Sequence, residues 1–216
     1  MASSMIHICV ANEVNKIIKK DRKSILIGSI APDISKLLNQ DKVKSHFLDD
    51  SDTDVPNTQR FLSKYEAYLD DDFVLGYYIH LYTDYLWFKY FLPRFANGGY
   101  IFNLNGNIQK VSKKELIDYL YNDYTNLNIK LIDEYNLSLD LFYEEVPEFN
   151  NIISEIPMNN LSVIIDKAGI IIENTKVHKP YMFDMKEIKN FIGDSVKKIL
   201  DNLIDINVIW NIWYYD

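Results

Sequence analysis

The chain of 216 residues is poor in cysteine, glycine and proline. It has one Cys, seven Gly and six Pro, which excludes a disulfide scaffold, a collagen-like repeat and a low-complexity chain. Because Cys9 is alone, no intramolecular disulfide can form, as expected of a protein from a reducing compartment. The hydrophobic share of 48% then indicates a globular chain whose core needs no disulfide or structural metal.

Basic residues and long apolar runs are also scarce. Lys and Arg total 23 against 31 Asp and Glu, a net charge of -8, so a nonspecific electrostatic footprint for duplex nucleic acid or an anionic membrane is missing. We predict no nucleic-acid partner, and a local basic groove stays an open alternative. No window approaches the ~18 apolar residues of a membrane span, so we expect no stable membrane insertion. The first residues lack a basic stretch ahead of an apolar run, which argues against a secretory signal. We therefore expect a cytoplasmic protein.

Helical periodicity dominates the sequence. The pattern predicts helices over residues 4–20, 58–69, 72–92, about 113–135 and about 185–203, with two more between 138 and 176 broken near Pro147 and Pro157. Ser112 with Glu115, and Asp184 with Glu187, have the spacing of capping boxes. We predict an all-α, bundle-like single domain over 1–216.

Two segments of the predicted domain have distinctive patterns. The helix over 72–92 is hydrophobic nearly all round, so it should be central. Asn105-Gly106 favours a small hairpin near 100–112, although a plain loop is an alternative.

The most informative polar feature is His80-Leu-Tyr-Thr-Asp84. Residues four apart on a helix project from one face and can bind one ion together, and Gly76, one turn earlier, is expected to leave room beside them. His7, Asp33 and His46 are further ligand types within apolar segments. Burying such groups without partners costs several kcal/mol, so a shared metal is one explanation and core histidines bonded to their own helices are another.

These residues occur in an ordered set of motifs that resembles the zinc-dependent phospholipase C family, in particular its short leaderless bacterial members. The motifs are His7, GSIAPD ending at Asp33, SHF containing His46, and GYYIHLYTDYLW containing His80 and Asp84. The similarity extends less specifically through YNDYTNLN and covers most of the first 130 residues. It implies the helical fold shared by phospholipase C and P1-nuclease-like metallohydrolases.

The resemblance also implies roles for the five residues. Asp33, His46, His80 and Asp84 would bind one ion, and Asp84 would bridge to a second ion that His7 also binds. Zn²⁺ is the expected metal, as one or two ions, and Fe²⁺ or Mn²⁺ suits the same ligand types. Such an ion lowers the pKa of water toward ~7 and so supplies a nucleophile. Asp33 is the candidate catalytic proton acceptor.

The sequence departs from the secreted members of that family. It begins with Met1 or Ala2 where they have a tryptophan, and no His-x3-Glu pair follows Asp84. His178 is expected at the surface, outside the site. We therefore expect one or two ions, and a metal-dependent hydrolase of phosphate esters or phosphodiesters rather than a secure phospholipase. The substrate would be a small phosphorylated molecule or a lipid headgroup, and the residues that bind it are unknown.

Two alternative functions stay open at this point. One is a non-catalytic metal-binding or sensing helical protein, and another is a helical interaction domain that binds no metal. Asp123 and Tyr124 either rim the pocket or serve the fold. The aromatic tail VIWNIWYYD is expected to pack on the domain or on a second copy in a homodimer, rather than in a membrane interface. A metallohydrolase of the His-Asp type is disfavoured, since no His is followed directly by Asp.

Overall fold

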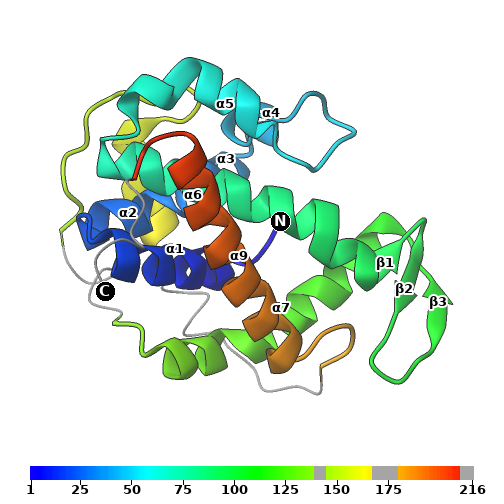
Figure 1. The fold of residues 1–216 in the computed structure, drawn as a ribbon. Helices are drawn as coiled ribbons and strands as arrows, with labels where there is room; N and C mark the ends of the chain where they lie inside the picture. The colour runs from blue at the N-terminus through cyan, green and yellow to red at the C-terminus, as the bar shows by residue number, and fades with distance from the viewer. Residues whose placement is uncertain (139–144, 167–179, 210–216) are drawn as a thin grey trace.

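Helix α6, Asp72–Leu86, lies at the centre of the molecule (Figure 1). The computed structural model describes residues 1–138, 145–166 and 180–209. The Asp71 side chain caps α6 by accepting from the amides of Phe73 and Val74, and nearly every α6 side chain is buried. Around it pack α1 (Ser4–Ile18), α2 (Arg22–Gly28), α5 (Thr58–Tyr65) and α9 (Met185–Asp205). The prediction of a central apolar helix is confirmed.

Helix α2 crosses α6 at two glycines, which lets the two backbones touch. A Cβ built on Gly76 would lie 2.3 Å from the carbonyl oxygen of Ile25, and one on Gly28 would lie 2.3 Å from that of Phe73. Only glycine fits at both positions. The expected role of Gly76 was wrong, because the space beside it admits α2 rather than a metal site.

Of the remaining helices, α4 (Lys42–Ser45), α7 (Lys113–Tyr135) and α9 begin at side-chain caps, and α3 (Ile34–Leu37) does not. The short helices α3 and α4 precede α5. The capping box of Ser112 and Glu115 is present in both directions. Asp184 caps α9 by accepting from two amides, but the Glu187 carboxylate pairs with Arg94 at 2.8 Å, so the second box is half formed.

A small antiparallel sheet follows α6, after a π-helical turn at Trp87–Phe91 and a 3₁₀ turn at Leu92–Arg94. Its strands are β1 (Ala96–Asn97), β2 (Tyr100–Phe102) and β3 (Ile108–Lys110), in that order. The predicted hairpin is confirmed, with Gly106 at a φ of 79° in its turn. The two-residue β1 was not predicted.

The segment after α7 contains less helix than expected. Residues 145–157 form no helix; a 3₁₀ turn at Met158–Asn160 and a helical stretch over 161–166 follow. Side-chain packing holds the extended part instead, since the ring centroids of Phe149 and Phe73 are 4.6 Å apart and Ile153 is buried. The rest of the two predicted helices lies outside the described residues, as do His178 and most of the aromatic tail.

The structure is mostly helical, which confirms the all-α class at that level. Of the helices in the described ranges, none is both long and apolar enough to cross a bilayer.

Candidate metal centre

Five side chains from four separate parts of the chain meet beside the middle of α6. His7 comes from α1, and His80 and Asp84 come from α6. Asp33 lies in the 3₁₀ turn Ala31–Asp33, and His46 is the residue that ends α4. All five are buried, and Asp33, at 7%, has the largest exposed fraction.

The distances between their polar atoms are short. His46 Nε2 lies 3.3 Å from His80 Nε2 and 3.5 Å from Asp33 Oδ1. Ligands bound at 2.0–2.1 Å at the corners of a tetrahedron lie about 3.3–3.4 Å apart. The group Asp33, His46 and His80 therefore has the spacing that a zinc ion needs, and all of its ligand atoms lie within 4.8 Å of one another.

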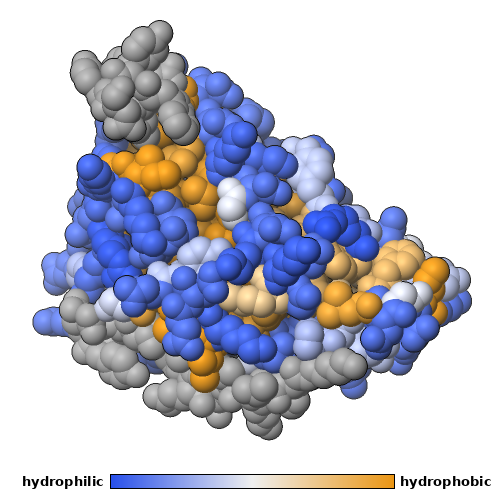
Figure 2. All heavy atoms as spheres, turned by 60° about the horizontal axis from the view of Figure 1, so that its bottom comes forward, coloured by the Kyte–Doolittle hydropathy of each residue, from blue (hydrophilic) through white to orange (hydrophobic). Residues whose placement is uncertain are grey.

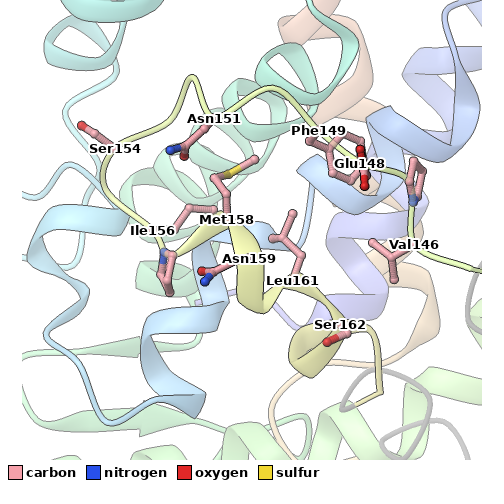
Figure 3. A pocket seen from close by; sticks show the side chains of 12 residues that line it. Val146, Glu148, Phe149, Asn151, Ser154, Ile156, Met158, Asn159, Leu161 and Ser162 are labelled. Carbon is pink, nitrogen blue, oxygen red and sulfur yellow. The ribbon is translucent and has the colours of Figure 1, made fainter.

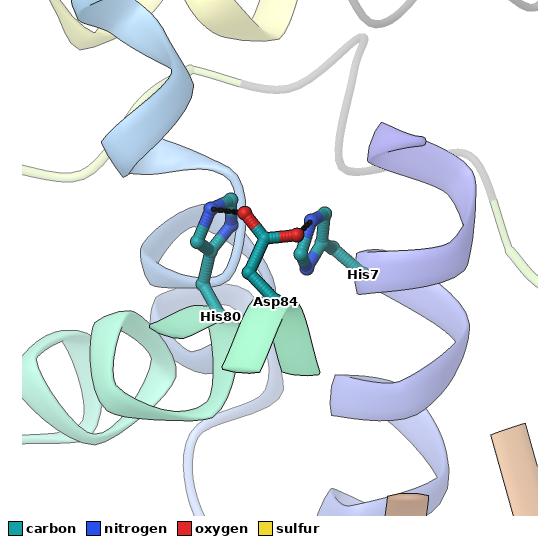
Figure 4. Close-up of side chains that lie close together, drawn as sticks. All are labelled: His7, His80 and Asp84. Atoms are coloured by element: carbon teal, nitrogen blue, oxygen red, sulfur yellow. Dashed lines mark ion pairs between the residues drawn. The ribbon is translucent and has the colours of Figure 1, made fainter. Parts of the chain in front are cut away.

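Asp84 connects this group to His7 (Figure 4). Its Oδ1 lies 3.3 Å from His7 Nε2, whereas its Oδ2 lies 3.6 Å from His80 Nε2 and 3.9 Å from His46 Nε2. The rings of His7 and His80 are stacked, with centroids 3.8 Å apart. His7, His80 and Asp84 thus form a second group with metal-ligand spacing, and the two carboxylate oxygens face different histidines.

Several polar atoms in this cluster are buried without a hydrogen bond. They are both ring nitrogens of His7, Oδ1 of Asp33 and Oδ2 of Asp84. Elsewhere in the described ranges the same condition is found only at Trp87 Nε1, Asn128 Oδ1 and Ser195 Oγ. Because an unpaired buried polar atom is costly, three of them that face the cluster, His7 Nε2, Asp33 Oδ1 and Asp84 Oδ2, indicate a missing partner that accepts lone pairs. A divalent cation fits that description.

Hydrogen bonds behind the cluster orient two of the imidazoles. His80 Nδ1 lies 2.7 Å from the carbonyl oxygen of Ser29. Since a carbonyl only accepts, Nδ1 carries the proton and Nε2 presents its lone pair to the cluster. His46 Nδ1 lies 2.9 Å from Ser45 Oγ, which in turn bonds Ser35 Oγ at 2.8 Å. Metal-binding histidines have supports of this kind.

The pKa directions favour the ligand forms of the side chains. Burial, with the nearby His7, lowers the pKa of His80 from 6.5 to about 3, so its imidazole is neutral at pH 7. Burial alone would raise the pKa of Asp33, but His46, whose Nε2 lies 3.5 Å from its Oδ1, and the neighbouring His80 and His7 lower it to about 2. Burial alone would raise the pKa of Asp84 as well, but His7, the N-terminal ammonium and His80 together lower it. Both carboxylates are therefore ionised at pH 7.

Three contacts at the cluster were not anticipated from the sequence. The Ala2 amide donates to Asp84 Oδ1 at 3.0 Å, and the Tyr124 hydroxyl donates to the Met1 carbonyl at 2.6 Å. The His80 support from Ser29 is likewise a backbone contact, and a backbone atom leaves no residue signature. The sequence left the roles of Asp123 and Tyr124 undecided. Tyr124 contacts Met1, beside the cluster. Asp123 instead binds the amides of residues 181–183 and serves the fold.

A separate cavity of about 830 Å³ lies along residues 146–162 (Figure 3). Its lining includes Glu148, Asn151 and Asn159 but none of the five clustered residues. The cavity is therefore not the entrance to the cluster.

Taken together, all five residues selected from the sequence lie in one buried cluster. Comparisons with protein-family models, with curated proteins and with solved structures found no match, so the geometry of this cluster and the order of its motifs are the grounds for assigning a function.

Proposed function

We propose that His7, Asp33, His46, His80 and Asp84 bind one or two divalent metal ions, with Zn²⁺ first and Fe²⁺ or Mn²⁺ as alternatives. The observation that carries this proposal is the convergence of buried, unpartnered nitrogen and oxygen atoms at metal-ligand spacing. Asp33, His46 and His80 would hold one ion, and His7 would hold a second. Asp84 would serve both, because its two oxygens face the two groups.

We further propose that the protein is a metal-dependent hydrolase of phosphate esters or phosphodiesters. A bound divalent ion would supply a nucleophilic water at neutral pH and would neutralise charge on phosphoryl oxygens. The support is the mixed imidazole and carboxylate ligand set, together with the resemblance of its motif order to the zinc-dependent phospholipase C family.

Of the five proposed ligands, Asp33 has the side chain with the most contact with solvent. Its side chain is 10% exposed, whereas those of His7, His80 and Asp84 are fully buried. With a pKa of about 2 it is a weak base in the metal-free protein, so its role as a ligand has more support than its role as a proton acceptor.

The same burial favours a second candidate, a non-catalytic metal-binding or sensing protein. No cluster side chain in the structure exceeds 10% exposure, which leaves little area for a substrate. An enzyme of this kind needs an open position on its metal, whereas a structural or sensing site does not.

Activity of the wild type and of Asp84→Asn against a panel of phosphomonoesters and phosphodiesters separates the two functions. The assay is run with Zn²⁺, Mn²⁺ and Fe²⁺ in turn. Hydrolysis by the wild type that disappears in Asp84→Asn supports the hydrolase. Stoichiometric metal with no hydrolysis of any ester supports the sensing protein.

A further inference from the structure

The region that follows the metal cluster along the chain has a charge opposite to that of the whole protein. Between Asp84 and Glu115 there are five basic residues and no acidic one, in a chain of net charge -8. This region contains the three-stranded sheet and the first turn of α7. A local positive field on an acidic protein is a feature that an anionic partner can use.

The sheet turns an apolar face to the solvent. Ile101 is fully buried, whereas its neighbours Tyr100 and Phe102 are exposed, as expected for alternating side chains. The register places Phe102 opposite Ile108 and Tyr100 opposite Lys110, so these four share the outward face. Ile108, at 67%, is the most exposed large apolar side chain in the described ranges. Figure 2 shows apolar atoms gathered at the right-hand end, where Figure 1 places β2 and β3.

The opposite side of the sheet is what fastens it to the protein. The Leu104 amide donates to the Tyr181 carbonyl at 3.0 Å, and the Tyr181 hydroxyl donates to Gln109 Oε1 at 2.8 Å. The Gln109 side chain also donates to the Tyr119 hydroxyl at 3.3 Å. The outward face is therefore presented on a supported sheet, with Tyr100, Phe102 and Ile108 exposed on it.

Lysines border this face. Lys110 lies on it, and Lys113 and Lys114 follow in the first turn of α7. None of these three lysines forms an ion pair with another described residue, whereas Arg94 in the same region pairs with Glu187. The apolar side chains Ile117 and Tyr121 are also exposed. They lie four and eight residues beyond Lys113 in α7, so they are on the same face of that helix as Lys113.

We propose that this surface, formed by Tyr100, Phe102, Leu104, Ile108, Lys110 and Lys113, docks on an anionic lipid surface. Exposed apolar side chains enter the boundary between headgroups and acyl chains, while flanking lysines bind lipid phosphates. The contact is interfacial and requires no spanning segment.

Two other occupants fit the surface less well. A second copy related by a two-fold axis would bring lysines against lysines, which repel. A single-stranded nucleic acid could stack bases on Tyr100 and Phe102, but Leu104 and Ile108, the most exposed side chain of the surface, have no flat face for a base.

Vesicle sedimentation tests the proposal directly. Purified protein is mixed with vesicles of phosphatidylcholine alone, or of phosphatidylcholine and phosphatidylserine in equal amounts. We expect binding to the mixed vesicles, weaker binding to the neutral ones, and loss of binding at high salt. The double variants Phe102→Ser/Ile108→Ser and Lys110→Glu/Lys113→Glu should each bind roughly tenfold more weakly or worse.

Control variants at exposed residues outside the proposed surface show whether the loss of vesicle binding is specific to that surface. Ile129→Ser removes an apolar side chain elsewhere on α7 whose exposure lies between those of Phe102 and Ile108, and Lys186→Glu/Lys197→Glu reverses two exposed lysines of α9. Both should bind as the wild type does. Asp84→Asn should also bind normally, because docking does not depend on the metal cluster, and this separates the proposal from the proposed function.

Several results would overturn the proposal. One is that the folded wild-type protein binds no vesicles. Another is that all variants bind equally well, and a third is that neutral and phosphatidylserine-containing vesicles are bound equally. Concentration-dependent dimers in light scattering that vanish in Phe102→Ser/Ile108→Ser would assign the surface to a second copy. Binding of a thymidine oligonucleotide without vesicle binding would assign it to nucleic acid. Because the exposed lysine reversals do not touch the core, they keep the test valid if the apolar variant misfolds.

Discussion

The Nδ1 atom of His80 lies 2.7 Å from the carbonyl oxygen of Ser29, one residue beyond the end of α2. Through this hydrogen bond, the packing of α2 against α6 determines how the His80 ring is oriented in the cluster. Gly28 and Gly76 bring α2 and α6 into backbone contact, which places the Ser29 carbonyl behind the imidazole. The carbonyl then holds the His80 Nε2 lone pair toward Asp33, His46 and Asp84.

Gly76→Ala tests the helix crossing. The new Cβ would lie 2.3 Å from the backbone oxygen of Ile25, which no rotamer change can relieve, so we expect a loss of about 1–3 kcal/mol in the free energy of unfolding. Gly193→Ala is the matched control, since nothing lies within 4 Å of its Cβ and it sits inside α9. It should stabilise by up to about 1 kcal/mol. Urea unfolding of both proteins measures the difference, and equal midpoints would refute the close crossing.

Ser45→Ala tests the support behind His46. Loss of the hydroxyl 2.9 Å from Nδ1 frees the ring, so we expect zinc affinity to fall roughly tenfold or more, with the fold intact. Competition with a chromophoric chelator gives the affinity. Ser63→Ala, on exposed α5 surface, should bind zinc as the wild type does. Unchanged affinity in Ser45→Ala would mean that the hydroxyl does not position the imidazole.

The stability of the metal-free protein should fall as the pH is lowered from 6.5 toward 3. Burial lowers the pKa of His80 from 6.5 to about 3, so in this window the unfolded chain binds a proton that the folded chain does not. The slope from this group approaches about 1.4 kcal/mol per pH unit. The lowered pKa values of Asp33 and Asp84 add a further loss below 3.8.

Urea unfolding at pH 7, 6 and 5, with chelator present, checks this dependence. His80→Gln removes the titrating imidazole and should give a shallower slope over the same range. Identical slopes in the two proteins would show that His80 does not stay neutral in the folded state.

Different parts of this structure were predictable to different degrees. The helices with caps, such as α7 after Ser112, could be placed closely, because local hydrogen bonding fixes where they begin. The pairing of His80 with Asp84 followed from helical geometry. The meeting of His7, Asp33 and His46 with that pair depends on contacts between distant segments, so spacing alone could not give it. It was indicated by the placement of ligand-type residues in apolar segments and by the order of the motifs.

Other features leave no readable signal in one sequence. The role of Gly76 was misassigned because a helix crossing and an open pocket both require a missing side chain. Residues 145–157 were included in the two helices predicted between 138 and 176, yet they form no helix, and Phe149 packs against Phe73 of α6 instead. Ala2 and Ser29 act through backbone atoms, which any residue type supplies.

Elemental analysis of the untagged protein, purified without added metal, shows whether the five clustered residues hold a metal ion. We expect one or two equivalents of zinc, iron or manganese per chain, and a reduced content in His46→Ala, because that imidazole lies between His80 and Asp33. Folded wild-type protein that carries no metal and takes up none on reconstitution would contradict the account, and the five residues would then be a structural cluster.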